Sequence, residues 1–339
     1  MTMSNPTSIV RTLADLARLA GVSPGTVSRA LAGKSIVNDA TRQRIEALAT
    51  QHNFQPNQMA RRLRTQQTGV IGIALPLGHE RRQHISDPFF LTLFGHLADA
   101  LTERNYDVML SRIIPDAEDW LSRVVRSGMV DGVLLIGQSD QFDVIEAVAR
   151  DYRPLVVWGS HIPGQHHCAI GVDNFTGGRL LGERLIGHGA TRIAFMGEIR
   201  TLEIAERYRG LCAAAGAAGI ATPIQLNTHM ASDVMGAEIT ANLDHVAGAI
   251  DAIACASDVI ARQTVRILAD RGLSVPGDLR VTGFDNLPFT EQMVPSLTTI
   301  SQDLVTGSAA MIDALFARMD GVDAPSVEMT PRLIVRDSA

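Results

Sequence analysis

Two short helical patterns around a tight turn occupy residues 12–31 and restrict the fold of this end of the chain. Thr12 followed by Asp15 fits a capping box, so the sequence predicts a helix that begins directly after Thr12. Gly21 is suited to the left-handed conformation of the residue that ends a helix. Apolar residues at positions 13, 16, 17 and 20 give this helix one buried stripe. The stretch has the form of a helix–turn–helix unit.

A second helix is predicted to begin after Ser23, a favoured N-cap, with Pro24 in the first helical position. Asn38 predicts the cap of a third helix that runs to about Gln51. Arg29 is expected to point outward from the second helix, and an arginine can grip O6 and N7 of guanine together, which is worth about 1–3 kcal/mol of base discrimination. The same pattern also fits a small helical bundle with a solvated arginine face. The residues alone leave both interpretations open.

The charge of the chain is unevenly divided. The first 66 residues hold nine Lys and Arg against three Asp and Glu, whereas the remaining 273 hold 21 against 33. A basic segment on an acidic body favours a polyanionic partner for the basic segment alone. The three cysteines are widely spaced and fit reduced thiols better than a disulfide framework. With no apolar run of about 18 residues and no signal-peptide pattern, we expect a soluble, cytoplasmic protein.

After residue 69 the pattern changes to apolar runs of strand length that alternate with amphipathic helical stretches. Such alternation predicts parallel sheets of the doubly wound kind, and the length suits two such units with a cleft between them. Gly177-Gly178 is interpreted as a place of close backbone packing. The predicted strands are Val70–Leu75, Asp107–Ser111, Gly132–Ile136, Leu155–Trp158, Ile193–Met196, Ala252–Cys255, Val281–Phe284 and Leu333–Val335, with helical patterns over Phe90–Arg104 and Gly178–Gly187.

Several short motifs occur along the chain in a characteristic order and spacing. They are Ala20-Gly-Val-Ser23, Thr26-Val-Ser-Arg-Ala-Leu31, Phe54–Leu63, Asp87-Pro-Phe-Phe90, Val172-Asp-Asn, Gly189–Gly197, Arg207-Tyr-Arg-Gly210, Gly283-Phe-Asp-Asn286 and Pro295–Ile300. With these motifs, which span nearly the full chain, the sequence resembles the LacI/GalR family of bacterial transcription regulators.

The resemblance implies an α/β protein with an N-terminal helix–turn–helix head and a hinge helix. A body similar to periplasmic sugar-binding proteins follows, built from two doubly wound parallel-sheet subdomains between which the chain crosses three times. The implied boundaries are 10–56 for the DNA-binding domain, 57–69 for the hinge helix and linker, 70–171 with 302–330 for the N-terminal subdomain of the body, and 172–301 with 331–339 for its C-terminal subdomain.

In the family, the second helix lies in the major groove and the hinge helix enters the minor groove. By that resemblance Leu63 is the apolar wedge that opens the central base step, and Ala60 packs near its dyad mate. Arg61, Arg62 and Arg64 would contact phosphate. A wedge of this kind costs a few kcal/mol of unstacking, which the additional contacts of the kinked duplex offset.

Three positions depart from the family in a way that bears on specificity. Pro24 and Gly25 stand where family members usually carry base-reading side chains, and an Asn is common at Ala32. We therefore expect Arg29, Thr26 and the hinge to carry most of the sequence readout. The full set of implied DNA-binding residues is Thr12, Ser23, Pro24, Gly25, Thr26, Ser28, Arg29, Asn38, Asn57, Ala60, Arg61, Leu63 and Arg64.

Five residues of the body are candidates for binding an effector. Ligands of open α/β sheets bind beyond the carboxyl ends of strands, and Asp258 and Asp285 each follow a predicted strand. Their carboxylates can accept paired hydroxyls of a sugar, with Arg207 as a charged donor, while Phe89 and Phe90 can form an aromatic wall. A helix cap or loop role for the carboxylates and a core role for either ring remain open. The resemblance implies effector contacts at all five positions.

The effector expected from the resemblance is a sugar or sugar phosphate, with no cofactor. A purine-type corepressor is the alternative. The family often has Asn where Ser257 stands, Asp at Gly159, and in some sugar binders an aromatic residue at Ala231. These departures leave the identity of the effector open.

Other chemistry finds little support in the sequence. His161, His166, His167 and Cys168 lie close together, but their spacing matches no zinc pattern, so we expect no metal site. We find no phosphate loop, GxSxG or HExxH motif, and we expect no enzyme. A solute-binding sensor that does not bind DNA is the alternative from a different class, and the basic N-terminal segment argues against it.

The sequence thus predicts a DNA-binding regulator, repressor-like, whose affinity for operator depends on an effector. Two heads of a homodimer would read the half-sites of a near-palindrome. No leucine heptads follow the strand predicted at 333–335, so we expect a dimer rather than a tetramer. Whether the effector releases DNA or promotes binding stays open, because either needs only a different affinity for two states.

Overall fold

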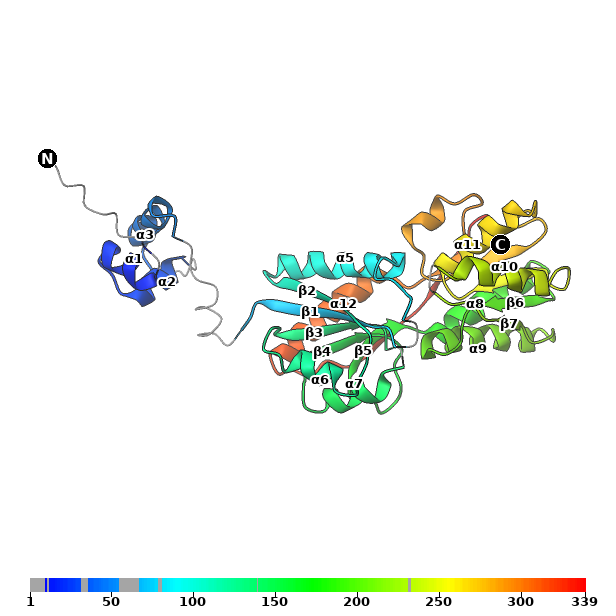
Figure 1. Cartoon of the computed structure of the whole chain (residues 1–339), viewed down its shortest axis with the longest axis horizontal. Coiled ribbons are helices and arrows are strands. Elements are labelled where there is room, and N and C mark those ends of the chain that lie inside the picture. Colours follow the sequence, from blue (N-terminus) through cyan, green and yellow to red (C-terminus); the bar gives the residue numbers. More distant parts are fainter. Residues whose placement is uncertain are drawn as a thin grey trace. The chain divides into compact units, whose positions relative to one another are not determined.

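The computed structural model divides the chain into two compact units, Met1–Thr68 and Gly69–Ala339 (Figure 1). Within the described residues, no helix is both long and apolar enough to span a membrane. The structure describes residues 10, 12–31, 36–54, 67–78, 81–138, 140–230 and 233–339.

The first unit contains the three predicted helices. They are α1 (Leu13–Ala20), α2 (Pro24–Leu31) and α3 (Asp39–Gln51). The capping box is confirmed, because the Thr12 hydroxyl accepts a hydrogen bond from the Asp15 N–H while the Asp15 carboxylate accepts one from the Thr12 N–H. Gly21 ends α1 with a φ of 65°, and the Asn38 side chain caps α3 by accepting from the Thr41 N–H at 2.8 Å.

One aliphatic core joins these three helices. Leu16 of α1, Val27 of α2 and Ile45 of α3 are fully buried against one another. Each lies on the apolar stripe of its helix, so burial of the three stripes fixes which face of α2 is left outside. The predicted helix–turn–helix arrangement is confirmed.

The second unit begins with a parallel six-stranded sheet, ordered β11-β5-β4-β3-β1-β2. Side chains alternate between its faces: Leu134 and Ile136 of β3 enter one core, while Val133 and Leu135 enter another. Helices α5 and α12 cover the first face and α6 and α7 the second (Figure 1). The elements are β1 (Val70–Pro76), α5 (Pro88–Glu103), β2 (Asp107–Ile113), α6 (Trp120–Val125), β3 (Gly132–Ile136), α7 (Phe142–Ala149), β4 (Leu155–Trp158), β5 (Cys168–Val172), α12 (Leu304–Met319) and β11 (Val327–Met329).

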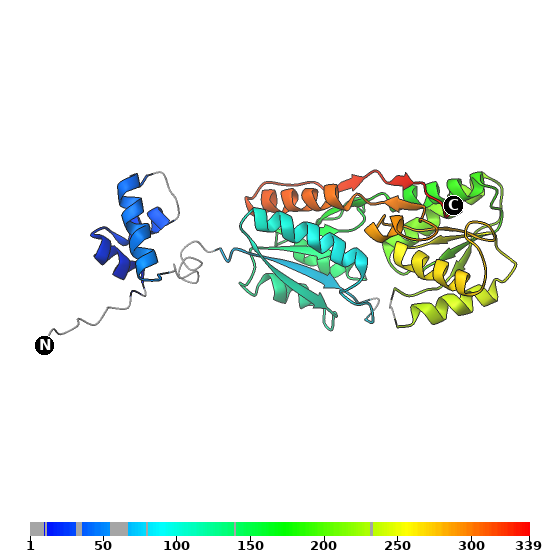
Figure 2. The same cartoon turned by 90° about the horizontal axis from the view of Figure 1, so that it is seen from above.

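A parallel four-stranded sheet, ordered β7-β6-β8-β9, forms the other half of this unit, and the short antiparallel pair β10-β12 lies beside it. Helices α8 and α9 lie on one side of the four-stranded sheet and α10 and α11 on the other (Figure 2). The elements are α8 (Asn174–Gly187), β6 (Ile193–Met196), α9 (Leu202–Ala217), β7 (Ile224–Leu226), α10 (Met235–His245), β8 (Ala252–Cys255), α11 (Asp258–Asp270), β9 (Arg280–Thr282), the 3₁₀ helix η1 (Pro288–Glu291), β10 (Thr299–Ser301) and β12 (Arg332–Ile334).

The chain passes between the two larger sheets after β5, after β10 and after β11. In each sheet the first strand in sequence lies between the second and third, so the strand order reverses direction there. Two doubly wound sheets joined by three crossings is the fold that the resemblance implied, and it is confirmed.

Helices α8 and α9 approach each other closely. A Cβ on Gly178 would lie 1.9 Å from the Arg207 backbone oxygen, and one on Gly210 would lie 1.9 Å from that of Phe175. No side chain fits in either place, so both glycines are needed for this contact. The prediction of close backbone packing at Gly177-Gly178 is confirmed for Gly178, whereas Gly177 lies against the Phe284 side chain. The backbone contact sets the position of α9.

Candidate functional site

The outer face of α2 carries the residues predicted to read DNA. Ser23, Pro24, Gly25 and Arg29 are exposed, while Thr26 is partly buried and its hydroxyl lies 2.9 Å from that of Ser23. A Cβ on Gly25 would lie 3.8 Å from Nη2 of Arg29, so the guanidinium extends over the first turn of the helix. Within the described residues, Arg29 has no hydrogen bond and no ion pair.

The remaining DNA-binding residues differ in what the structure describes. Ser28 is partly buried on α2, and Thr12 and Asn38 serve as N-caps of α1 and α3. Ala32 lies outside the described residues, as do the predicted hinge positions Asn57, Ala60, Arg61, Leu63 and Arg64.

A cavity lies at the carboxyl ends of the two larger sheets in the second unit. It encloses about 820 Å³ of empty space, its open mouth included. Its wall includes residues at the ends of, or directly after, β1, β3, β4, β5, β8 and β9. Doubly wound proteins bind their ligands at this place in the sheet. The lining residues are Pro76, Leu77, Gln83, Asp87, Phe89, Phe90, Ile136, Gly137, Trp158, Gly159, Gly171, Val172, Asn174, Thr201, Glu203, Ile204, Arg207, Met230, Ser257, Asp285 and Gln302.

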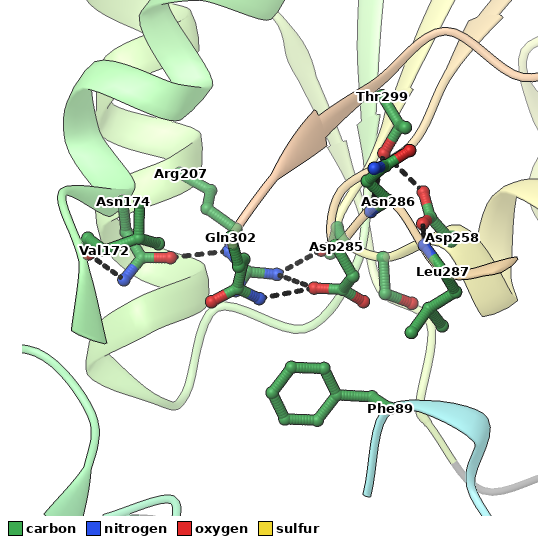
Figure 3. Close-up of polar contacts among 12 residues, drawn as sticks. Phe89, Val172, Asn174, Arg207, Asp258, Asp285, Asn286, Leu287, Thr299 and Gln302 are labelled. Atoms are coloured by element: carbon green, nitrogen blue, oxygen red, sulfur yellow. Dashed lines mark hydrogen bonds and ion pairs between the residues drawn. The ribbon is translucent and has the colours of Figure 1, made fainter. Parts of the chain in front are cut away.

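Arg207 of α9 is the centre of a buried polar network (Figure 3). Its Nε donates to the Asn174 side-chain oxygen at 2.8 Å, and Nη1 donates to the Ala256 backbone oxygen at 2.6 Å. Nη1 also lies 3.7 Å from the Asp285 carboxylate. The second terminal nitrogen, Nη2, has no partner among the described residues. A fixed guanidinium with one nitrogen unused can donate to a ligand oxygen.

Asp285 faces the same space from the segment after β9. Its backbone N–H donates to the Ile300 oxygen at 2.8 Å, and its φ of 121° lies in the left-handed region that non-glycine residues rarely adopt. The carboxylate accepts from Gln302 at 2.6 Å. Burial raises the pKa of Asp285, and the nearby Arg207 charge and the Gln302 hydrogen bond oppose that rise. The strained backbone holds this carboxylate beside Arg207.

Asp258 is placed differently from the other predicted effector residues. It is the first residue of α11, is completely buried, and is not among the residues that line the cavity. Its carboxylate accepts from the Thr299 hydroxyl at 2.5 Å and from the Leu287 N–H at 2.8 Å. Burial and the neighbouring Asp285 raise its pKa well above the usual value. These bonds tie α11 to the loop after β9.

The aromatic rings of Phe89, Phe90 and Trp158 contribute to the apolar side of the cavity. Phe89, partly buried on the first turn of α5, lies edge-on to Phe90 and 6.3 Å from the Trp158 ring, measured between centroids. Figure 3 places the Phe89 ring across the open space from Arg207, Gln302 and Asp285. Phe90 is buried in the core under α5 and also borders the cavity. A ring opposite a polar network suits a flat ligand with an apolar face and a polar edge.

Several polar residues of this site were missed by the sequence analysis. Asn174, Gln302, Asp87 and Glu203 line the cavity alongside the predicted residues. Asn174 belongs to the Val172-Asp-Asn motif, so its position could have been inferred, and Asp87 precedes Phe89 in another motif. Gln302 and Glu203 had no signal, because only the fold brings β10 and α9 to the same wall.

Gln138 occupies the space beside Gly159. A Cβ on Gly159 would lie 2.5 Å from the Gln138 side-chain nitrogen, and that nitrogen donates to the Ser160 backbone oxygen at 2.5 Å. The departure from the family at Gly159 is thus accompanied by a buried glutamine in the adjacent space.

Two of the three histidines in the 160–169 segment, His166 and His167, contact one carboxylate. Nδ1 of His166 lies 2.8 Å from one oxygen of Glu146, and Nδ1 of His167 lies 2.6 Å from the other. The backbone N–H groups of both histidines also donate to Glu146. Although burial alone would raise it, these hydrogen bonds lower the pKa of Glu146 to about 2. The cluster fastens the β4–β5 connection to α7.

Known proteins match this chain over nearly its full length. The model of "Bacterial regulatory proteins, lacI family" matches residues 12–57, and that of "Periplasmic binding protein-like domain" matches 183–339. The "HTH-type transcriptional regulator RegA" of Clostridium saccharobutylicum is 30% identical over 336 residues, which are 96% of this chain and 98% of that protein.

Two solved structures with bound sugars are also similar. The "transcriptional regulator CelR-cellobiose complex" has a TM-score of 0.69 and 26% identity, and covers 97% of this chain and 99% of its own. A regulator from Enterococcus faecium "with bound ribose" has a TM-score of 0.68 and 27% identity, and covers 79% of this chain and 98% of its own.

Proposed function

Because the chain belongs to the LacI family of bacterial regulatory proteins, we propose that it represses transcription by binding an operator and that an effector in the cavity changes its affinity for DNA. The observation that carries this proposal is the pairing of two separate sites in one chain. Arg29 on α2 is exposed and unpaired within the described residues, and the Arg207 network in the other unit borders the cavity. The first suits DNA and the second suits a small polar ligand.

We propose that α2 enters the major groove and that Arg29 reads a guanine there. Thr12, Ser23, Pro24, Gly25, Thr26, Ser28 and Asn38 are proposed as further contacts of the same head. The hinge residues Asn57, Ala60, Arg61, Leu63 and Arg64 are proposed for the minor groove, on the basis of the family alone. Two heads of a homodimer would bind a near-palindromic site in the cytoplasm, where the chromosome is.

For the effector we propose a sugar bound between the body subdomains, taken as 70–171 with 302–330 and 172–301 with 331–339. Arg207 and Asp285 would bind its hydroxyls, and Phe89 would cover its apolar face. Phe90 and Asp258 would act behind these contacts, the first by supporting Phe89 and the second by holding the loop that carries Asp285. The sugars bound by the two similar structures support this choice.

The test is DNA binding by the full-length protein. Fluorescence anisotropy should show retention of a duplex from its own promoter region at concentrations where a scrambled duplex stays free. Affinity should fall steeply with salt, since each neutralised phosphate contributes about −0.9 to the log–log slope. A protein that retains neither duplex, with or without sugars, would be a solute-binding sensor instead.

Effector dependence is measured in the same assay. Sugars and purines are added one at a time to the protein–DNA complex, and the expected result is that one sugar changes the dissociation constant at least fivefold, in either direction. A purine that does so while the sugars do not would assign the protein to the corepressor alternative, because a flat base can also lie on the Phe89 ring.

A further inference from the structure

The wall of the cavity is acidic. Among the described residues that line it are the carboxylates of Asp87, Glu203 and Asp285, against the single guanidinium of Arg207. Asp285 is paired with that guanidinium. Asp87 accepts from the Phe89 N–H at 2.9 Å and from the Gln83 side chain at 3.1 Å. One carboxylate is left without a side-chain partner.

That carboxylate belongs to Glu203, in the first turn of α9. Its Oε1 accepts a hydrogen bond from the Ser160 N–H at 3.3 Å. No side chain in the described ranges donates to it, and no arginine or histidine nitrogen there lies within 4.0 Å of it. Burial raises its pKa, and two backbone N–H groups and the charge of Arg207 oppose the rise. A partly buried carboxylate with this few donors is costly unless a ligand supplies more.

The positive N-terminal ends of the helices around the cavity already have acidic residues of the chain beside them. The N-cap residues Asp87, Thr201 and Ser257 all line it, and an unoccupied helix N-terminus attracts anions. Each of the three helices, however, has an acidic residue of the chain at its start: the Asp87 cap on α5, Glu203 on α9 and Asp258 on α11. A phosphate would therefore meet carboxylates where it needs free N–H groups.

Among the described residues of this wall, Arg207 supplies the one positive charge, but the Asp285 carboxylate already pairs with it. Nε and Nη1 are held by Asn174 and Ala256, so only Nη2 remains to donate to a ligand. We propose that Glu203 is a specificity-determining residue that accepts hydrogen bonds from hydroxyls of an uncharged sugar and excludes sugars that carry a phosphate or carboxylate group. The proposal rests on the proposed function of the cavity and narrows its ligand. Sugar hydroxyls supply the donors that Glu203 lacks, whereas a second anion in a site of low dielectric constant is repelled.

Isothermal titration of the full-length protein tests this with glucose, ribose and cellobiose, and with glucose 6-phosphate and ribose 5-phosphate. At least one uncharged sugar should bind. Both sugar phosphates should bind at least 100-fold more weakly than the uncharged sugar that binds most tightly. Glu203→Gln keeps the size of the side chain but removes its charge. We expect this variant to bind the uncharged sugar five- to tenfold more weakly and to discriminate less against the sugar phosphates.

Glu206→Gln is the matched control. Glu206 lies one turn further along α9, does not line the cavity and pairs with Arg209 at 2.5 Å, so its loss should change neither affinity nor discrimination. Tighter binding of either phosphate than of its uncharged counterpart overturns the proposal. So does a panel in which no uncharged sugar binds, or an unchanged ratio in folded Glu203→Gln. Operator binding is measured separately, so a protein that retains DNA but responds to a phosphorylated sugar contradicts this inference alone.

Discussion

The guanidinium carbon of Arg207 lies 3.7 Å from the centre of the Phe284 ring. The next residue, Asp285, provides the carboxylate 3.7 Å from the same guanidinium, so consecutive residues supply an aromatic face and an opposite charge. The ring itself lies against α8, where a Cβ on Gly177 would be 2.7 Å from it. The position of the charged donor in the cavity therefore depends on packing among α8, α9 and the segment after β9.

Replacing Arg207 should affect both stability and ligand response. Arg207→Ala leaves the Asp285 carboxylate buried without its charge partner, and we expect a loss of about 3–5 kcal/mol in the free energy of unfolding, measured with urea. Arg209→Ala, on the exposed side of the same helix, should cost less than 1 kcal/mol. A loss below 1 kcal/mol for Arg207→Ala would contradict the role given to this network.

The contact between α8 and α9 should tolerate no side chain at Gly178. The added Cβ would meet backbone atoms, which cannot move aside as a flexible side chain can, so Gly178→Ala should lower the free energy of unfolding by at least about 2–3 kcal/mol. Gly187→Ala is the control, since it ends the same helix with nothing within 4 Å of the new Cβ. Equal stabilities of the two variants in thermal unfolding would argue against this packing.

Gly159 and Gln138 should be energetically coupled. Gly159→Ala places a methyl group against the Gln138 side chain and should cost about 1–3 kcal/mol. Gln138→Ala makes room for that methyl group, so the double variant should be more stable than the sum of the single effects by at least about 1 kcal/mol. A double-mutant cycle in urea measures the coupling, and strictly additive effects would show that the two residues do not compete for space.

Stability should depend on pH through Glu146. Its folded pKa of about 2 lies below the usual value of 4.5, so its contribution is complete above about pH 4.5 and is lost as the pH falls toward 2. Glu146→Gln should thus be less stable than the parent at pH 7 by about 1–3 kcal/mol, with the difference narrowing as the pH falls from about 4.5 to 2. Glu183→Gln, whose partner Arg179 is exposed, should show a small difference at every pH. If the difference in the free energy of unfolding between Glu146→Gln and the parent did not change with pH, the loss would come from packing and not from the charge.

Arg29 should govern specificity more than affinity for DNA in general. Arg29→Ala should reduce the ratio of operator to scrambled-duplex affinity by about tenfold or more, since a bidentate contact to guanine is worth about 1–3 kcal/mol. Arg29→Lys keeps the positive charge but not the planar guanidinium. It should therefore bind the scrambled duplex as the parent does, while the ratio of operator to scrambled-duplex affinity falls. Anisotropy with both duplexes measures this, and an unchanged ratio in Arg29→Ala would remove the residue from base readout.

Local patterns were sufficient for the helix–turn–helix unit and for most strands. The capping box at Thr12, the left-handed Gly21 and the Asn38 cap are interactions between residues three or four positions apart, so the sequence contains all their parts. Strands β3, β4, β6 and β8 have the predicted bounds because each is a buried apolar run with a clear change of pattern at both ends. β5, β7, β10 and β11 were not predicted, although β9 and β12, which are as short as β7, β10 and β11, were.

Residues close together in the chain were enough to predict the repeating strand–helix pattern, the helix caps and the position of Asp285 directly after a strand, whereas Arg207 was assigned to the cleft through the family resemblance. Only the tertiary structure decided which side chains reach the cavity. The Asp258 carboxylate accepts a buried hydrogen bond from Thr299 and does not reach the cavity. Glu203 and Gln302, from distant segments of the chain, line its wall. The physical reason is that a side chain is accessible or buried according to the segments that pack against it. Here the chain crosses three times between the two larger sheets, so those segments come from distant parts of the sequence.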